Sequence, residues 1–489
     1  MKRLFSILLL MSLLLSLFGC KDTEETAETD MNTLPALPAL GAYDLYAGFD
    51  RKNITPREPI ELGGYSNAAN RVSQAIQDEL FVTSIALTDA QGNTVIFMNW
   101  DGVRSYPLQQ ETVRMTLAQE TGVDANNIYI GATHSHSCPD MNETSEALER
   151  YKAYVVEQAI ASAIEALQDR RPANMSAGTI EAEGLNFVRH YATTLDDGTV
   201  TYFGDNFNTA VYNDTTTHAS EADPTMFMLY FEMAEGKPMC LINWRAHPHF
   251  TGGTSQYNVS SDWVGAFRDA FEYQTGVDML YFNGAAGNIN EKSRLSKENQ
   301  TTDYKVHGKL LADYAISLMD TNLEAVQVDQ IQTKQTIFQG RVNHAQDHLY
   351  AQASEVVAIW RATGDSDAVA QAGEPYGIRS RFHASAIMSN MKRDSNQPRE
   401  LNAILLGKDV SLVTAPNELF DTNSVWLETN APTKYTLTLG YTNGHYGYIP
   451  SALAWEYTCY ETDITYLEQG TAEQYQECFL EMIEAMHAQ

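Results

Sequence analysis

Three short apolar stretches constrain the fold more than any other feature of this chain. They cover residues 95–100, 128–130 and 239–244, and none of them contains a charged residue. Unbroken apolar runs of this kind are typical of central strands that are buried on both faces of a sheet. A helix predicted over residues 108–120 separates the first two stretches, and the order strand, helix, strand indicates a parallel crossover. We therefore expect an α/β (mixed α+β) fold with central mixed or parallel sheets flanked by helices.

Two of these stretches run into pairs of histidines. Residues 128–130 lead to His134 and His136, and residues 239–244 lead to His247 and His249. Side chains two apart on an extended backbone leave the same face, so His134 and His136 can act together. Imidazoles at the end of a strand suit a metal site or a proton-transfer site. A His-x-His pair taken alone is about equally consistent with a functional site and with two exposed loop histidines.

Two further candidate residues lie at or after the ends of predicted strands. Glu418 follows strands predicted within residues 401–414, and Tyr448 follows a strand predicted over residues 435–441. Together with His134 and His247 they form a set that is widely spaced in sequence, as the ligands of catalytic zinc sites are. Spacing alone leaves simpler interpretations open. Each histidine could be a core residue, Glu418 could begin a helix, and Tyr448 could be an ordinary member of the 26 tyrosines.

The N-terminal segment is predicted to be a processing signal. Residues 1–20 combine Lys2 and Arg3 with an apolar run and end in Leu-Phe-Gly-Cys, which matches a bacterial lipoprotein cleavage box with Cys20 as the lipidated residue. A transmembrane helix is the alternative, but the run is shorter than the ~20 residues that a span requires. Residues 21–40 are polar and acidic at first and are predicted to form a flexible tether. We expect an extracytoplasmic protein, anchored to a bacterial membrane only through its lipid.

Charge and cysteine content narrow the possible partners. The formal net charge is −31, which argues against nucleic acid and against docking on anionic lipid through a basic patch. A neutral or cationic substrate is more compatible with this negative charge than an anionic one. Cys459 and Cys478 are the nearest pair in sequence and could form a disulfide outside the cytoplasm, although free thiols are the slightly favoured alternative.

A series of motifs, taken in order, resembles the catalytic domain of the neutral/alkaline (non-lysosomal) ceramidases. The most specific is Thr-His-Ser-His-Ser at residues 133–137. The matching pieces cover residues 50–56, 64–65, 132–137, 186–189, 243–248, 287–288, 416–418, 443–448, 456–457 and 460–461. We therefore expect residues 41–489 to form a single ceramidase-like catalytic domain, without the immunoglobulin-like C-terminal domain of full-length ceramidases.

The resemblance implies a zinc-dependent amidohydrolase. By analogy with the family, the metal ligands would be His134, His247, Glu418 and Tyr448. The residues around the reacting group would be His136, Arg189 and Tyr460, with His136 moving a proton toward the leaving amine. The substrate implied is ceramide or a related N-acyl lipid, cleaved to a fatty acid and a sphingoid-type amine.

Some positions depart from the family pattern. Cys138 stands where the family usually has glycine, and His249 stands where a small hydroxyl residue is commoner. These changes leave other N-acyl or ester substrates open on the same zinc site. The alternative outside enzymes is a binding lipoprotein without catalytic activity. Such a protein would have no need for all six of the residues His134, His247, Glu418, Tyr448, Arg189 and Tyr460.

Overall fold

The computed structural model describes residues 42–65, 71–204, 212–253, 256–295, 301–457 and 459–489. The predicted processing signal, with Cys20, and the predicted tether lie outside these residues. By their mutual contacts, the described residues belong to one compact unit. None of their helices is both long and apolar enough to cross a bilayer.

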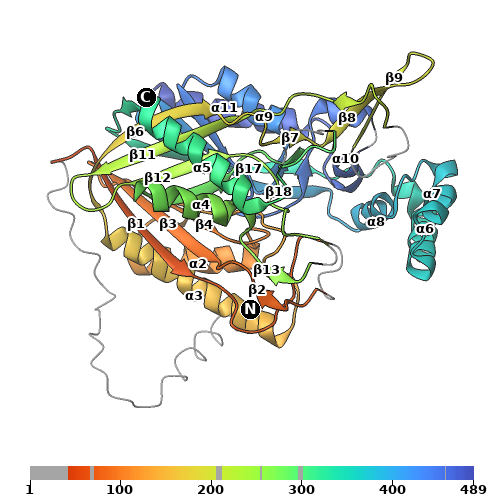
Figure 1. Ribbon diagram of the computed structural model, residues 1–489, viewed down its shortest axis with the longest axis horizontal. Helices are drawn as coiled ribbons and strands as arrows, with labels where there is room; N and C mark the ends of the chain where they lie inside the picture. Colours follow the sequence, from red (N-terminus) through yellow and green to blue (C-terminus); the bar gives the residue numbers. More distant parts are fainter. Residues whose placement is uncertain (1–41, 66–70, 205–211, 254–255, 296–300, 458) are drawn as a thin grey trace. The chain divides into compact units, whose positions relative to one another are not determined.

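A large mixed sheet forms the centre of the described structure (Figure 1). Along its main path the strands follow the order β14 (Asp278–Asn283), β12 (Met239–Trp244), β11 (Thr225–Met233), β6 (Arg171–Glu181), β1 (Leu45–Asn53), β3 (Phe81–Asp89), β4 (Thr94–Trp100) and β5 (Ile128–Ala132). The short β16 (Glu324–Val326) pairs with β6. Only the β4–β5 and β12–β14 pairs in this sheet are parallel, and the other pairs are antiparallel.

Smaller sheets complete the strand layout. A second sheet has the order β17 (Ile331–Arg341), β18 (Asn396–Leu406), β19 (Val410–Thr414) and β21 (Tyr435–Leu439). Short strands pair as β10 (Thr217–His218) with β8 (His190–Thr194), β8 with β9 (Val200–Gly204), β13 (Asn258–Val259) with β2 (Ala75–Ile76), β15 (Ile289–Asn290) with β7 (Phe187–Val188), and β20 (Glu418–Leu419) with β22 (Tyr448–Ile449). The predicted class of mixed sheets flanked by helices is confirmed.

One topology occurs three times among these elements, although the sequence shows no internal repeat. An antiparallel hairpin is followed by a helix, and the helix leads to a strand parallel to the second hairpin strand. The three copies are β3–β4–α2–β5, β11–β12–α4–β14 and β18–β19–α9–β21, where α2 is Pro107–Thr121, α4 is Asp262–Thr275 and α9 is Asp421–Asn430. Each copy therefore presents the carboxyl ends of two neighbouring parallel strands. Binding and active sites commonly form at such strand ends.

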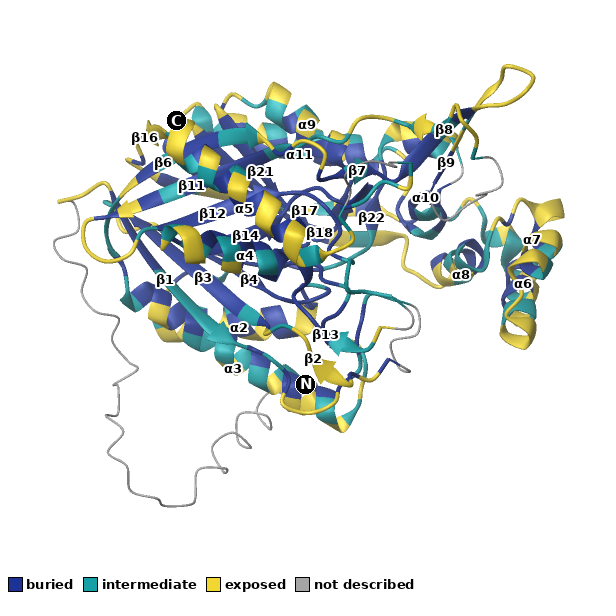
Figure 2. Cartoon of the chain, in the orientation of Figure 1, coloured by how far each residue is buried: buried dark blue, intermediate teal, exposed yellow. Residues whose placement is uncertain are grey.

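The core lies where these copies meet. One apolar cluster takes Leu87 and Phe97 from the first copy, Leu241 and Phe282 from the second, and Leu437 from the third. The strands at the centre are buried along most of their length, whereas exposed residues lie on the outer faces of the helices (Figure 2). This burial explains the unbroken apolar stretches in the sequence, since a strand covered on both faces has no solvent side to make polar.

Three longer helices and one short helix pack around the strands. They are α3 (Glu146–Gln168), α5 (Tyr304–Thr321) and α11 (Thr471–His487), with the short α10 (Tyr460–Ile464), whereas α6 (Tyr350–Thr363) belongs to a separate helical insertion. Helix α3 packs against β1 and β3, and α5 packs against α4, β6 and β11. Ser145 caps α3 by accepting a hydrogen bond from the backbone of Leu148, and acidic residues in the first turn favour the same start.

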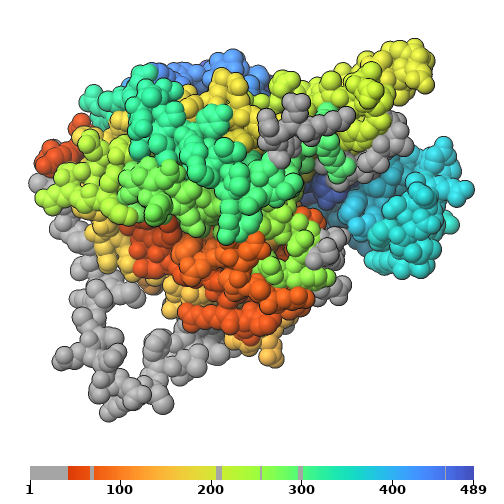
Figure 3. Space-filling view, viewed as in Figure 1, coloured from red at the N-terminus to blue at the C-terminus, as the bar shows by residue number. Residues whose placement is uncertain are grey.

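A helical insertion separates the antiparallel strands β17 and β18. It contains α6, α7 (Ser366–Gly373) and α8 (Arg381–Asn390), which share a small apolar core of their own. In the space-filling view the insertion is a cyan lobe beside the rest of the described chain (Figure 3). An ion pair between Arg379 and Asp463 ties it to α10. The insertion therefore has a fixed attachment close to Tyr460.

The four cysteines of the described part are all free thiols. Cys138, Cys240 and Cys459 are buried, and Cys478 is half-buried. The favoured alternative of free thiols therefore holds for Cys459 and Cys478.

Candidate metal centre and active site

Two histidines present the same nitrogen to one point. His134 follows β5, and its Nδ1 donates to the carbonyl oxygen of Val103 at 2.7 Å. His247 follows β12, and its Nδ1 donates to the carbonyl oxygen of Ile289 at 2.9 Å. Because a carbonyl can only accept, each ring carries its proton on Nδ1 and leaves the Nε2 lone pair available as a ligand in the neutral form.

Glu418 brings a carboxylate to this point from the third topological copy. Its Oε2 lies 3.5 Å from Nε2 of His134 and 3.4 Å from Nε2 of His247. Its Oε1 accepts a hydrogen bond from Nε2 of His445 at 2.9 Å. Burial raises the pKa of the Glu418 carboxyl, but the surrounding imidazoles, His134 first among them, outweigh burial and hold that pKa well below its usual range.

The third imidazole of the cluster belongs to His136. Its Nε2 lies 3.2 Å from Nε2 of His134, and ligand atoms of His134, His136 and His247 all lie within 4.8 Å of one another. Burial is the main cause that lowers the pKa of His136 well below its usual range, and the neighbouring imidazoles add to it. Its geometry is compatible with a metal ligand as well as with the predicted proton-transfer residue.

The spacing of these atoms fits a tetrahedral metal ion. Metal–ligand bonds of about 2.0–2.2 Å imply ligand–ligand distances of roughly 3.3–3.6 Å in a tetrahedron. The two contacts of Glu418 Oε2, at 3.5 and 3.4 Å, fall in this range. Both Glu418 Oε2 and His247 Nε2 are buried without a well-formed hydrogen bond among the described residues. Buried polar atoms normally have partners, so a bound cation would account for both.

Tyr448 and Tyr460 lie beside the cluster. The parallel pairing of β20 with β22 sets Tyr448 opposite Glu418. The rings of the two tyrosines are 5.9 Å apart, and the guanidinium carbon of Arg189 lies 5.6 Å from the centre of the Tyr448 ring. Burial raises the pKa of Tyr448 well above its usual value and raises that of Tyr460 to about 12. Both phenols are therefore neutral near pH 7 in the absence of a metal ion.

Arg189 is held by a buried network that sequence analysis missed. Its Nη2 lies 2.5 Å from Oε1 of Glu461 and donates to the carbonyl oxygen of Gly287 at 2.8 Å. Oε2 of Glu461 lies 3.0 Å from Nε2 of His190, whose Nδ1 is 2.7 Å from the hydroxyl of Tyr457. His190, Cys459 and Glu461 have the spacing of a second candidate metal group. Hydrogen bonds among these residues and their neighbours already account for that arrangement.

His249 also belongs to the site, with Glu291 as its partner. Its ring centre lies 5.6 Å from that of His136, and its Nδ1 lies 2.9 Å from Oε2 of Glu291. Burial lowers the pKa of His249, but the charge and hydrogen bond of Glu291 outweigh it and raise that pKa overall. The sequence marked His249 as a departure from the family pattern but gave no sign of its acidic partner.

Three of the four strained backbone positions follow the strands β5 and β21, and the fourth, Asp262, begins α4. Four non-glycine residues of the described chain have positive φ, namely His134 (69°), Asp262 (57°), Tyr441 (56°) and Asn443 (58°). Tyr441 stacks on His134 with ring centres 4.3 Å apart. The side-chain oxygen of Asn443 accepts from the backbone of Ile130 at 2.9 Å, which ties the loop after β21 to β5. Such strain is retained where the surroundings fix it, and it is commonest at functional sites.

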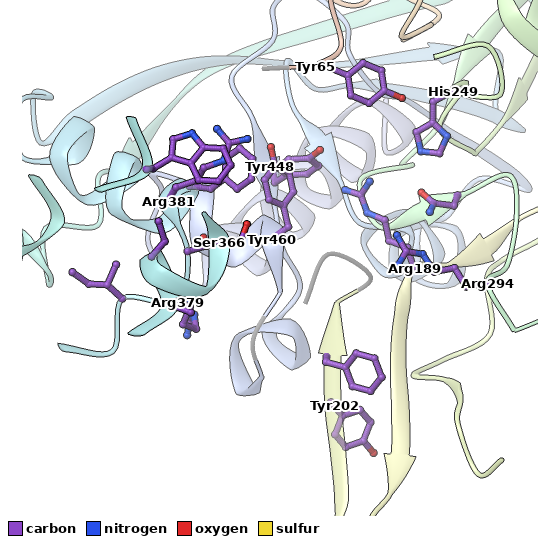
Figure 4. A pocket seen from close by; sticks show the side chains of 18 of the residues that line it. Tyr65, Arg189, Tyr202, His249, Arg294, Ser366, Arg379, Arg381, Tyr448 and Tyr460 are labelled. Atoms are coloured by element: carbon purple, nitrogen blue, oxygen red, sulfur yellow. The ribbon is translucent and has the colours of Figure 1, made fainter. Parts of the chain in front are cut away.

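A cleft of about 1370 Å³ opens from this site. Its inner lining includes His136, Arg189, Tyr448 and Tyr460, and its outer wall comes from the α6–α8 insertion and from β9. In the close view Tyr448 and Tyr460 lie between Arg189 on one side and Arg381 on the other, with Tyr65 and His249 above (Figure 4). His134, His247 and Glu418 do not line the cleft and are buried behind it.

The predicted site residues therefore fall into two groups. His134, His247 and Glu418 converge with His136 on one point. Arg189, Tyr448 and Tyr460 line the cleft, and Tyr448 pairs with Glu418 through the backbone. Chemically, this arrangement places a candidate cation site next to a cleft that is lined by neutral phenols and a guanidinium group.

Comparison with solved structures supports the fold. The structure is similar to that of neutral ceramidase from Pseudomonas aeruginosa, with a TM-score of 0.66 and 15% sequence identity over 91% of this chain and 75% of that chain. It is equally similar to a ceramidase complexed with C2, with a TM-score of 0.66 and 14% identity over 91% of this chain and 76% of that chain. No family model matches the sequence, and no curated protein does. The chain thus has a ceramidase-like fold.

Proposed function

We propose that this protein is a zinc-dependent amidohydrolase that cleaves the N-acyl bond of ceramide or a related N-acyl lipid to a fatty acid and a sphingoid-type amine. The observation that carries the proposal is the convergence of two oriented Nε2 atoms and one unsatisfied carboxylate oxygen behind the cleft. The ceramidase-like fold supports the choice of reaction.

The residues that would hold zinc are His134, His247, Glu418 and Tyr448. When bound at such a site, zinc acts as a Lewis acid and makes a nucleophile available from water near neutral pH. Carbonyl oxygens fix the two histidines in the ligand tautomer, and His445 fixes the orientation of the carboxylate. Such outer contacts are what give a metal site its rigidity.

The remaining residues would handle protons and charge. The lowered pKa of His136 keeps its ring neutral near pH 7, so it can accept a proton and pass it to the leaving amine. The neutral hydroxyl of Tyr460 and the guanidinium of Arg189 are donors at the edge of the cleft, where they could stabilise charge that develops on the carbonyl oxygen. The ion pair with Glu461 is neutral as a whole, and it fixes the position of the Arg189 guanidinium.

The cleft suits a lipid amide in size and lining. At about 1370 Å³ it exceeds the 300–1,000 Å³ that is typical of small-molecule pockets, which leaves room for a chain beyond the amide. Aromatic residues such as Tyr65, Phe203, Trp360 and Phe382 line its walls. We also propose that the protein works outside the cytoplasm, held at a bacterial membrane by lipid on Cys20, so that membrane-derived amides are within reach.

The proposal is tested on the full-length protein by metal analysis combined with activity. We expect about one zinc per chain, hydrolysis of a short fluorescent N-acyl-sphingosine, loss of activity on chelation and recovery on addition of zinc. Stable binding of the substrate without turnover in the zinc-loaded protein would favour the binding lipoprotein. Hydrolysis of ester analogues with no turnover of amides would favour the second hydrolase interpretation.

A further inference from the structure

A serine and a histidine outside the metal cluster are hydrogen-bonded in the wall of the cleft. Oγ of Ser293 lies 2.8 Å from Nε2 of His218. On the other side of the ring, Nδ1 of His218 donates to the carbonyl oxygen of Val188 at 2.5 Å. Because a carbonyl can only accept, the neutral ring carries its proton on Nδ1, and its Nε2 accepts the hydroxyl proton of Ser293. A serine bonded to an oriented base in this way has the arrangement of an activated nucleophile.

Two strand pairings bring these residues together. Strands β7 and β15 are antiparallel, with Val188 opposite Ile289, and Ser293 follows β15 by three residues. Strands β10 and β8 are also antiparallel, with His218 opposite Tyr191. The serine and the histidine are 75 residues apart in sequence, so their contact exists only in the folded chain.

Aromatic rings hold the imidazole of His218 in this orientation. The ring of Phe187 stacks on it with centres 5.7 Å apart, and the centre of the Tyr191 ring is 5.1 Å away. Burial lowers the pKa of His218, whereas the carbonyl of Val188 and the charge of Glu221 act in the opposite direction with a smaller effect. The ring is therefore mainly neutral near pH 7, the state in which it can take a proton from a hydroxyl group.

The serine is placed where a ligand can reach it. Ser293 is half-buried and lines the cleft of about 1370 Å³. Its Oγ accepts a hydrogen bond from the backbone N–H of Leu295 at 2.9 Å, which fixes the position of the oxygen. Arg294, labelled in Figure 4, also lines the cleft and brings a guanidinium group to the same stretch of wall. Such a group favours charge that develops on a carbonyl oxygen.

The pair is separate from the candidate metal cluster. Among the described residues, that cluster consists of His134, His136, His247 and Glu418, and neither Ser293 nor His218 contributes a ligand atom to it. A nucleophile supplied by a side chain replaces the metal-bound water as the attacking group. Chemistry at this serine would therefore be independent of zinc.

We propose that Ser293 and His218 form a second, metal-independent acyl-transfer site in the cleft, which hydrolyses carboxylic esters of fatty acids. The inference goes beyond the proposed amidohydrolase function and does not depend on it. A carbonyl holds His218 in the place that a carboxylate takes in the Ser-His-Asp triad. Because that carboxylate also stabilises the imidazolium ion, its absence favours an ester, whose alcohol leaves more readily than an amine.

The reaction needs only the ester and water. The hydroxyl oxygen of Ser293 attacks the ester carbonyl while its proton passes to Nε2 of His218. The bond to the alcohol oxygen breaks, the alcohol takes the proton from His218, and the acyl group stays on Ser293 as an ester. Water then attacks this acyl group with His218 as the base, and the serine oxygen regains a proton as the fatty acid leaves.

The first test is covalent labelling of the full-length protein in EDTA with a fluorophosphonate probe, which reacts with activated serines. Peptide mass spectrometry should find the adduct on Ser293, and Ser293→Ala should remove it. Labelling of His218→Gln should be slower by about 10²–10⁴, the usual worth of a general base. The control is His348→Gln, because His348 is exposed, bonds a carbonyl through Nδ1 and does not line the cleft. It should be labelled like the wild type.

The second test is hydrolysis of p-nitrophenyl laurate with and without EDTA. The wild type and His348→Gln should retain ester hydrolysis in EDTA. In the same buffer, kcat/KM of Ser293→Ala and of His218→Gln should fall by about 10²–10⁴. Circular dichroism checks that each protein remains folded under these conditions.

Three outcomes overturn the second site. They are an adduct on the wild type that is absent from Ser293, a labelling rate that is unchanged in His218→Gln, and ester hydrolysis that EDTA abolishes in protein that is still folded. Each of them leaves the proposed amidohydrolase intact, because amide hydrolysis by the zinc-loaded protein is measured separately. The position of the adduct on the wild type decides the assignment of Ser293 even where a variant fails to fold.

Discussion

Replacing Glu461 provides the sharpest test of how the site is held together. Its Oε1 accepts from Nε of Arg189 at 2.6 Å and lies 2.5 Å from Nη2, and its Oε2 lies 3.0 Å from His190. The side chains of Arg189 and Glu461 are only 7% and 1% exposed. Removing the carboxylate therefore leaves a buried guanidinium without its counter-charge, which is the costly way to break an ion pair.

The expected size of the effect follows from this burial. Glu461→Ala should lower the free energy of unfolding by about 3–5 kcal/mol, the usual cost of removing one partner of a buried pair. Glu461→Gln should cost less, because its amide oxygen can still accept from Arg189. Glu58→Gln is the matched control, since Glu58 makes a similar two-bond contact with Arg150 but is 43% exposed, and it should have little effect.

The pH dependence distinguishes the ion pair from simple packing. Arg189 and His190 outweigh the effect of burial and hold the pKa of Glu461 well below its usual value. A carboxyl whose pKa is depressed in the folded state contributes stability that is present above its unfolded pKa of about 4.3 and is lost as the pH falls toward the folded pKa. The stability difference between wild type and Glu461→Gln should thus be constant from pH 7 to about pH 5 and shrink below about pH 4.

Three measurements together test the role of the buried Arg189–Glu461 pair. Chemical unfolding gives the stability difference, elemental analysis gives the zinc content and steady-state kinetics gives turnover. We expect Glu461→Gln to retain its zinc, because Glu461 does not contact the histidine cluster, and to lose turnover through a displaced Arg189. A stability cost in Glu461→Ala no larger than in Glu58→Gln, or one that does not change with pH, would refute the buried-pair argument.

Four other predictions concern the metal and the anchor. His247→Ala should lose most of its zinc and activity, and stoichiometric zinc in that variant would remove His247 from the ligand set. His134→Ala should also lose zinc, whereas His136→Ala should keep it and lose about 10²–10⁴ in turnover; equal loss of zinc would make His136 a ligand. His445→Ala should weaken zinc binding by about 10- to 100-fold, measured by competition with a chelator. Cys20→Ser should abolish incorporation of labelled fatty acid, and continued labelling would contradict the lipoprotein prediction.

The sequence predicted those elements whose signal is local. Unbroken apolar runs gave β4, β5 and β12, because burial on both faces dictates each residue of such a strand. The crossover helix predicted over residues 108–120 corresponds to α2, Pro107–Thr121. The strand β6 was missed, since Arg171–Glu181 has few large apolar residues and a proline near its start, and its burial comes from neighbours elsewhere in the chain.

The residues of the candidate site also divide into those with a local sequence signal and those without one. His134 and His247 could be identified because each follows an apolar strand directly. The partner of Arg189 could not, since Glu461 lies 272 residues away and only the folded chain brings the two together. His445 lies 27 residues from Glu418, and its role depends on the tautomer and direction of its ring. Pairings of this kind are tertiary facts that periodicity and spacing do not encode.

The threefold topology explains why one site can be assembled from distant segments. Each copy ends two parallel strands at the same edge, and these edges supply His134 from the first copy, His247 from the second and Glu418 from the third. No single copy holds more than part of the candidate cluster, so the site exists only when all three are packed on their shared core. The α6–α8 insertion lies outside this arrangement, between β17 and β18, and its described residues contribute nothing to the candidate cluster. The fold therefore holds the candidate cluster at the strand ends, while the insertion forms part of the outer wall of the cleft.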